Sequence, residues 1–153
     1  AQQLFELGGQ QHLPGYAFKE FAGDRAATLD VISAVPFGIL ADPIGEVAGV
    51  VVPALAPALQ IGVGAGWTEL SSPFARDAAQ RLGPVFDPLT GAPLRDPLGA
   101  VRTPRATRTV RTTLTVGVQF FGGALYVGAG RALDASPDAP RVWRAVVAFG
   151  RLL

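Results

Sequence analysis

Three groups of residues have types that could do chemistry: one histidine with several serines, two glycine-rich runs, and a row of arginines. His12 is the only histidine in the chain. With an aspartate it could in principle complete a hydrolase triad around Ser33, Ser71 or Ser72. However, the sequence contains no Gly-x-Ser-x-Gly turn that would expose a nucleophilic serine. We therefore interpret His12 as a polar loop residue and predict that the chain is not an enzyme.

The glycine-rich runs 62–66 and 127–131 are similar to part of the loop that binds dinucleotide phosphates. Neither run completes G-x-G-x-x-G, and neither precedes a helical pattern with an acidic residue at the required distance. Glycines that face a narrow interior or ease the curvature of a strand explain both runs better. The chain also has no cysteine, which excludes thiol catalysis and cysteine-bound metals. We predict no metal and no other cofactor.

Four arginines recur at every third position, and threonines separate them: Arg102, Arg105, Arg108 and Arg111. On an extended strand this spacing places charges on both faces, so the row does not form a stripe for reading phosphates. With 13 basic and 12 acidic residues and a net charge of +1, we predict no nucleic-acid partner. Two interpretations remain: a solvated loop that leads into a strand, or a basic outer loop that contacts anionic lipid headgroups.

Period-two alternation indicates the elements that must position these residues. Apolar and polar residues alternate strictly over 113–120, and Gly122-Gly123 then predicts a tight turn into a second strand. The sequence predicts strands near 25–37, 47–67 (kinked at its prolines), 109–121, 124–133 and 141–153, and a short helix at 74–82. The run 49–67 is long and apolar enough to suggest a membrane helix, but its prolines and glycines argue against one.

The two faces of these strands indicate their setting. One face is apolar (Leu114, Val116, Val118), whereas the other carries threonine, glycine and glutamine. A soluble β domain usually exposes more charge, but only 16% of this chain is charged and 49% is hydrophobic. Outer-membrane barrels place apolar side chains toward lipid and small or polar ones inside, over segments of about ten residues. The pattern favours such a barrel slightly over a soluble glycine-rich β domain.

The chain up to the start of the first long strand contains Gly8 and Gly9, then Leu13, Gly15 and Tyr16, then Gly23, Asp24 and Arg25. This order of residues resembles one family of barrels. In the bacterial surface-antigen family, the outer-membrane assembly factors of the BamA and TamA type, a lumen loop reads Gly-Gly, then Leu/Val-Arg-Gly-Tyr/Phe. A Gly-Asn/Asp-Arg step then enters the next strand. Pro14 stands where that family carries its arginine.

The resemblance covers nearly the whole chain and implies an all-β fold, the C-terminal fragment of an antiparallel transmembrane β-barrel with about five strands. It divides the chain into a lumen loop (1–24), wall strands (25–67), a long external loop (68–108) and the last three strands (109–153). It implies insertion or translocation of proteins at the bacterial outer membrane. The implied partners are outer-membrane lipid and lipopolysaccharide, nascent outer-membrane proteins, and the rest of the barrel, N-terminal to Ala1.

Two alternatives stay open beside assembly. The chain could belong to a barrel of the same family that serves as a passive anchor or pore, or it could be a soluble glycine-rich β domain that binds a ligand. Five strands are too few to close a wall, because closed barrels of this kind begin at about eight strands. The barrel interpretation therefore requires further strands before Ala1.

Overall fold

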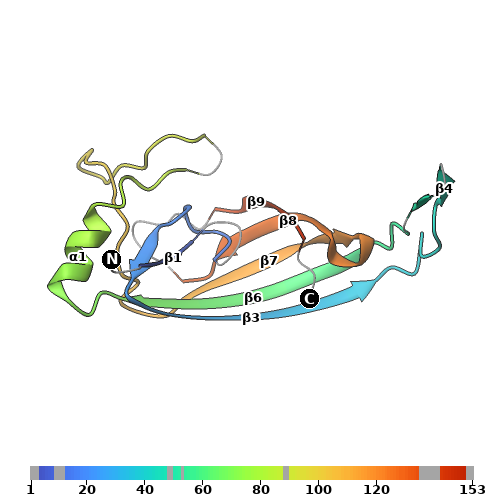
Figure 1. Ribbon diagram of the computed structural model, residues 1–153, viewed down its shortest axis with the longest axis horizontal. Coiled ribbons are helices and arrows are strands. Elements are labelled where there is room, and N and C mark those ends of the chain that lie inside the picture. The colour runs from blue at the N-terminus through green and yellow to red at the C-terminus, as the bar shows by residue number, and fades with distance from the viewer. Residues whose placement is uncertain are drawn as a thin grey trace.

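A five-stranded antiparallel sheet, in the order β3-β6-β7-β8-β9, forms the body of the protein (Figure 1). The computed structural model describes residues 4–8, 13–47, 50–52, 54–87, 90–134 and 142–150. An antiparallel all-β fold with about five strands was predicted and is confirmed. The strands are β3 (Arg25–Pro36), β6 (Ala58–Glu69), β7 (Arg111–Phe120), β8 (Leu125–Ala132) and β9 (Arg144–Phe149).

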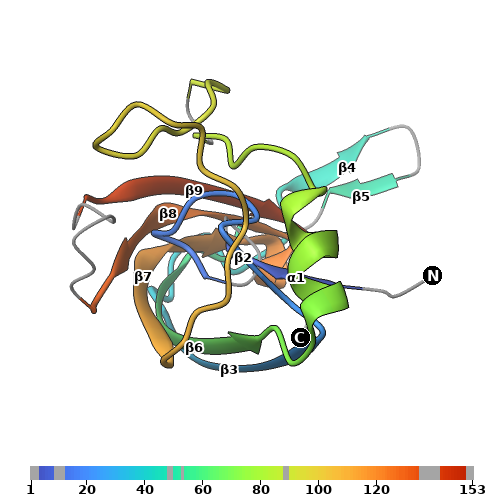
Figure 2. The ribbon, with the colours of Figure 1, turned by 90° about the vertical axis from the view of Figure 1, so that its left-hand side faces the viewer.

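The sheet is strongly curved, and its concave side wraps around the N-terminal segment (Figure 2). It does not close: within the described part of the chain, β3 and β9 are the two edges and have no strand on their outer sides. The N-terminal segment contributes the two short strands β1 (Phe5–Leu7) and β2 (Phe21–Gly23), which pair antiparallel.

Three predicted strands form within two residues of their expected bounds, and the last, predicted over 141–153, forms over 144–149. The predicted strand 47–67 does not form as one element. Its first part is β5 (Val50–Val52), which pairs instead with β4 (Gly45–Val47) in a separate hairpin. The sheet strand begins only at Ala58. Pro57 has no N–H for a ladder, and Ala56 adopts a φ of +37°, outside the extended region. Residues 141 and 151–153 of the predicted last strand lie outside the described residues.

The connection between β3 and β6 leaves the sheet at the same end as the β7–β8 turn and carries the β4–β5 hairpin away from it (Figure 1). The β7–β8 turn itself is tight, as predicted: Phe120 pairs with Leu125, and the turn η1 (Phe121–Gly123) lies between them. The loop between them is four residues long, and Phe121, Gly122 and Gly123 have φ values of +55°, +65° and +98°, a region that glycine adopts without steric cost.

The predicted short helix forms at α1 (Pro73–Gln80) in the long connection between β6 and β7. The Ser72 hydroxyl caps it by accepting a hydrogen bond from the Ala75 N–H at 3.1 Å. Pro73 suits the first turn, where its missing N–H removes no helical bond. Within the described ranges, no helix is long and apolar enough to cross a bilayer.

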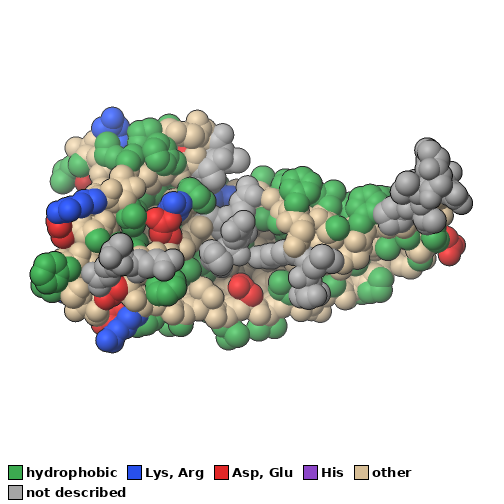
Figure 3. Space-filling view, viewed as in Figure 1, with side chains coloured by type: hydrophobic (Ala, Val, Ile, Leu, Met, Phe, Trp, Pro, Cys, Tyr) green, Lys and Arg blue, Asp and Glu red, His purple; other side chains and the backbone are tan. Residues whose placement is uncertain are grey.

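The two faces of the sheet differ as the alternation predicts. Register places apolar residues of neighbouring strands opposite one another on the convex face, as in the pairs of Val63 with Val31 and Val127 with Val147. These side chains are 42–62% exposed although they are apolar. Hydrophobic side chains lie along the whole sheet, whereas Lys and Arg gather at the end that carries α1 (Figure 3). Large exposed apolar patches mark surfaces that contact protein or membrane.

Candidate functional site

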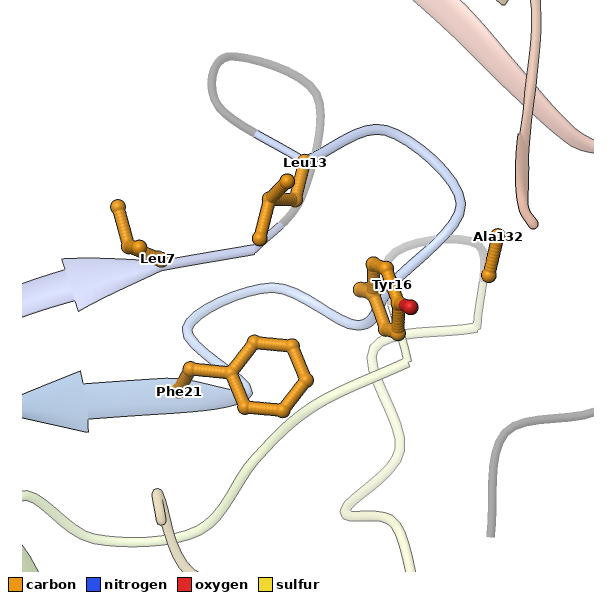
Figure 4. Packing of buried hydrophobic residues seen from close by; sticks show 5 residues of the cluster. All are labelled: Leu7, Leu13, Tyr16, Phe21 and Ala132. Atoms are coloured by element: carbon orange, nitrogen blue, oxygen red, sulfur yellow. The ribbon is translucent and has the colours of Figure 1, made fainter. Parts of the chain in front are cut away.

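The candidate site is the N-terminal segment on the concave face, residues 4–8 and 13–24, called the inner loop below. Its tip folds back on itself, because the Tyr16 N–H donates to the Leu13 carbonyl at 3.2 Å. A small apolar core holds the loop, and Tyr16 meets the edge of Phe21 with ring centroids 5.1 Å apart. Figure 4 shows the cluster, in which every member is at most 5% exposed: Leu7, Leu13, Tyr16, Phe21 and Ala132.

Glycines allow the tip of the inner loop to approach the sheet closely. A Cβ at Gly15 would lie 2.5 Å from the Ala132 nitrogen, and Gly15 has a φ of +104°. Across the contact, a Cβ at Gly130 would lie 2.5 Å from the Pro14 Cβ. Real Cβ atoms do not approach other atoms so closely, so neither position accepts a side chain without movement of the backbone or the proline ring. The glycines of the 127–131 run therefore serve as a packing surface.

A polar network fixes the loop tip to the sheet at Asp134. Its carboxylate accepts hydrogen bonds from the Tyr16 hydroxyl, from the Arg111 guanidinium at 2.7 Å, and from the Thr112 N–H at 2.9 Å. Burial and the bond to Asp134 raise the pKa of Tyr16 far above its ordinary value, so Tyr16 stays a neutral donor. Burial opposes the charge on Asp134, but the three hydrogen bonds outweigh it and hold its pKa below the ordinary 3.8.

This network makes stability depend on pH. Because its folded-state pKa is depressed, Asp134 stabilises the fold above about pH 4, and this contribution is lost as the pH falls through the folded-state value. At pH 7 the change Asp134→Asn is expected to lower the free energy of unfolding by about 2 kcal/mol, since it weakens a partly buried charged pair. Urea unfolding should show a smaller difference in the free energy of unfolding between the parent and Asp134→Asn at pH 2.5 than at pH 7. Asp42→Asn, at an exposed site, is the control, and an equal gap at both pH values would contradict the prediction.

A second network joins the inner loop to the long β6–β7 connection. Glu20 is only 3% exposed, and its carboxylate accepts from the Ala17 N–H at 3.0 Å. The same carboxylate lies 2.7 Å from the Arg102 guanidinium and 3.6 Å from that of Arg105. The Ala22 N–H also donates to the Arg105 carbonyl at 2.9 Å. Arg102 and Arg105 are thus structural partners of the inner loop, as Arg111 is through Asp134 and the Phe21 ring.

The Gly-Asp-Arg step lies at a different place, where the inner loop enters β3. Asp24 accepts hydrogen bonds from the Ser71 hydroxyl and from the Ser71 N–H, the latter at 2.8 Å. These bonds lower the pKa of Asp24. The Gly23 Cα packs against the backbone of Glu69, where a Cβ would be 2.5 Å from the carbonyl oxygen. Arg25 lies on the exposed edge strand, 3.8 Å from the Glu69 carboxylate.

The structure therefore separates the residues of the family-like motif into two groups. Leu13, Gly15 and Tyr16 meet the concave face, where Gly66 faces Leu13, and Gly8 lies close to the backbone of the same loop. Gly23, Asp24 and Arg25 instead form the junction with β6 and α1. Gly9 lies outside the described residues.

Sequence reasoning missed the anchors of the loop, Glu20, Arg111 and Asp134. Their partners are far along the chain: Asp134 bonds residues 118 and 23 positions away, and Glu20 bonds one 82 positions away. The only signal for Asp134 was its place at the start of a turn-rich loop.

The other chemical candidates have structural roles where the structure describes them. Ser71 binds Asp24, Ser72 caps α1, and Ser33 lies exposed on the edge strand β3. The 62–66 and 127–131 glycines lie within β6 and β8, and His12 lies outside the described residues. Among the residues described, no group of three or more acidic, histidine or cysteine side chains is arranged to hold a metal.

No protein-family model, no curated protein and no solved structure matches the chain.

Proposed function

We propose that this chain is the C-terminal part of an outer-membrane β-barrel of the surface-antigen type, which inserts or translocates proteins at the bacterial outer membrane. One observation carries the proposal: a curved antiparallel sheet exposes a continuous apolar convex face and holds a folded inner loop on a concave face of small and polar residues. A barrel wall that separates lipid from a lumen needs an apolar outer face and an inner face of small or polar residues.

The proposed mechanism is not enzymatic. The edge of β9 would form one side of a weakly paired seam, and its free backbone groups would template an incoming strand by edge pairing. The inner loop would brace the lumen through the Tyr16–Asp134 and Glu20–Arg102 bonds. The proposal requires further strands beside β3, because each unpaired backbone group in lipid costs several kcal/mol.

Two features bear on the choice between assembly and the alternatives. Pro14 occupies the family's arginine position and packs against Gly130 without supplying a charge. Neither neighbouring cation replaces that charge in the lumen, because Lys19 pairs with Glu6 at 2.6 Å and Arg25 pairs with Glu69. A passive anchor or pore of the same family is therefore the second candidate function. The exposed apolar convex face disfavours the soluble β domain.

Lipid contact can be tested with single cysteines, because the natural chain has none. Leu29 on the convex face is 65% exposed, and its neighbour Asp30 lines a small concave cavity with Pro14. With a fluorophore on Leu29→Cys or Asp30→Cys, nitroxide-labelled lipid in reconstituted vesicles should quench the first several-fold more strongly, since adjacent strand residues face opposite sides. Equal quenching at both positions would contradict a membrane wall.

Assembly itself can be tested by the rate at which a small outer-membrane barrel folds into vesicles that contain the protein. Removing residues 7–16 is expected to abolish the acceleration, since the bracing contacts of Leu13, Gly15 and Tyr16 are lost. Removing residues 90–99, an equally long and mostly exposed part of the β6–β7 connection, is the matched control. Electrophoretic heat-modifiability would confirm that both variants fold. An unchanged rate after the first deletion would favour the passive barrel.

A further inference from the structure

A cleft of about 1120 Å³ lies outside the concave face, at the end of the sheet that carries the long β6–β7 connection. Its floor is the end of β6, and its walls are α1 and residues 103–108, which cross this end of the molecule in front of the sheet (Figure 2). The lining residues that matter below are Trp67, Leu70, Arg76, Thr103 and Arg108.

The arginines at this cleft differ in their pairing. Arg105 and Arg111 lie near the carboxylates of Glu20, at 3.6 Å, and Asp134, at 2.7 Å. Arg76 and Arg108 are exposed and form no ion pair with any residue in the described ranges. The one acidic residue that lines the cleft, Glu69, lies 3.8 Å from Arg25. Two arginines that line the cleft, one in α1 and one in residues 103–108, thus remain for an anion.

The rest of the lining fits an anion that carries an apolar group. Trp67, Leu70 and Pro104 supply apolar surface beside the two arginines, and Thr103 adds a hydroxyl. Arg108 also has a φ of +62°, a left-handed conformation that is uncommon for residues other than glycine. Such backbone strain occurs preferentially at binding and catalytic sites.

We infer that this cleft binds a phosphate group, held between Arg76 and Arg108. The planar guanidinium fork matches phosphate oxygens in pairs, which makes arginine the usual residue for phosphate recognition. The phosphate could belong to a lipid headgroup, with its apolar part against Trp67, or it could be free in solution. This site is separate from the inner loop and does not depend on the proposed role in assembly.

Trp67 provides a direct reporter, because the chain has two tryptophans and Trp143→Phe leaves Trp67 alone. The full chain in a non-ionic detergent would be titrated with dihexanoyl phosphatidic acid, with inorganic phosphate and with dihexanoyl phosphatidylcholine. The first is expected to change the Trp67 fluorescence saturably. The double variant Arg76→Gln/Arg108→Gln should bind about a hundredfold more weakly, tenfold for each lost charged contact. Arg81→Gln/Arg95→Gln removes the same charge from exposed sites outside the cleft and should bind as the parent does.

The three titrations distinguish a phosphate that belongs to a lipid headgroup from a phosphate that is free in solution. Phosphatidic acid binding more tightly than inorganic phosphate supports a lipid headgroup, whereas equal affinities support free phosphate as the ligand. Phosphatidylcholine binding as tightly as phosphatidic acid, or no saturable binding of either phosphate probe, overturns the inference. Equal affinity of the two double variants for phosphatidic acid would also overturn the inference. Circular dichroism would establish that both double variants retain the β fold.

Discussion

Replacing Val31 by arginine is expected to weaken insertion of the folded protein into a bilayer by about 2–4 kcal/mol, the usual effect of a basic residue on the lipid face at mid-depth. Val31 lies in the middle of β3, is 62% exposed on the convex face, and pairs with Val63. The measurement is the free energy of unfolding from vesicles, obtained from reversible urea titration. This substitution tests the central claim of the proposed function, that the convex face contacts lipid.

The neighbouring change Asp30→Arg is the matched control. Asp30 is also exposed on β3, but it lies on the opposite face, beside the inner loop. It places the same new side chain one residue away on the same strand, and we expect an effect within about 0.5 kcal/mol, as at most surface sites. If both variants lost the same stability, or if Val31→Arg lost none, the convex face would not be a lipid surface.

Gly15→Ala is expected to release the tip of the inner loop from the sheet. The new Cβ would lie 2.5 Å from the backbone of Ala132 and would force a residue with a side chain into a φ of +104°. Left-handed strain costs about 1–3 kcal/mol and overpacking about 1–3 kcal/mol, so the loss of local stability is about 2–6 kcal/mol. Lys19 is the only lysine in the chain and lies in the inner loop. A protease that cleaves after lysine should therefore cut this variant at least tenfold faster.

Gly83→Ala is the control for a left-handed alanine placed elsewhere in the chain. Gly83 has a φ of +83°, but a Cβ there would meet no atom within 4 Å. This variant carries the strain of a left-handed alanine without a steric clash, and it lies outside the inner loop, so the rate of cleavage at Lys19 should stay at the parent value. Equal protection of Lys19 in Gly15→Ala and the parent would show that the close contact with Ala132 does not hold the loop.

Local patterns predicted the strands of the sheet, since alternation and turn chemistry act between near neighbours. The alternation over residues 113–120 predicted which side chains of β7 share a face, and Gly122-Gly123 predicted the turn into β8. The prediction of one strand over 47–67 failed although its apolar composition suits a strand, because β5 and β6 form separate elements. There the left-handed Ala56 and the donor-free Pro57 end strand pairing before β6.

The sequence by itself determined the strand periodicity, the apolar character of one face, the short helix after Ser72 and the lack of thiol chemistry, because these follow from residue types and their spacing. Only the tertiary structure decided how the inner loop is held and how the arginine row divides. Arg102 and Arg105 turn to Glu20, Arg111 turns to Asp134, and Arg108 faces the cleft. Those partners lie tens of residues apart in the chain, and the curvature and register of the sheet bring them together, which no local pattern records.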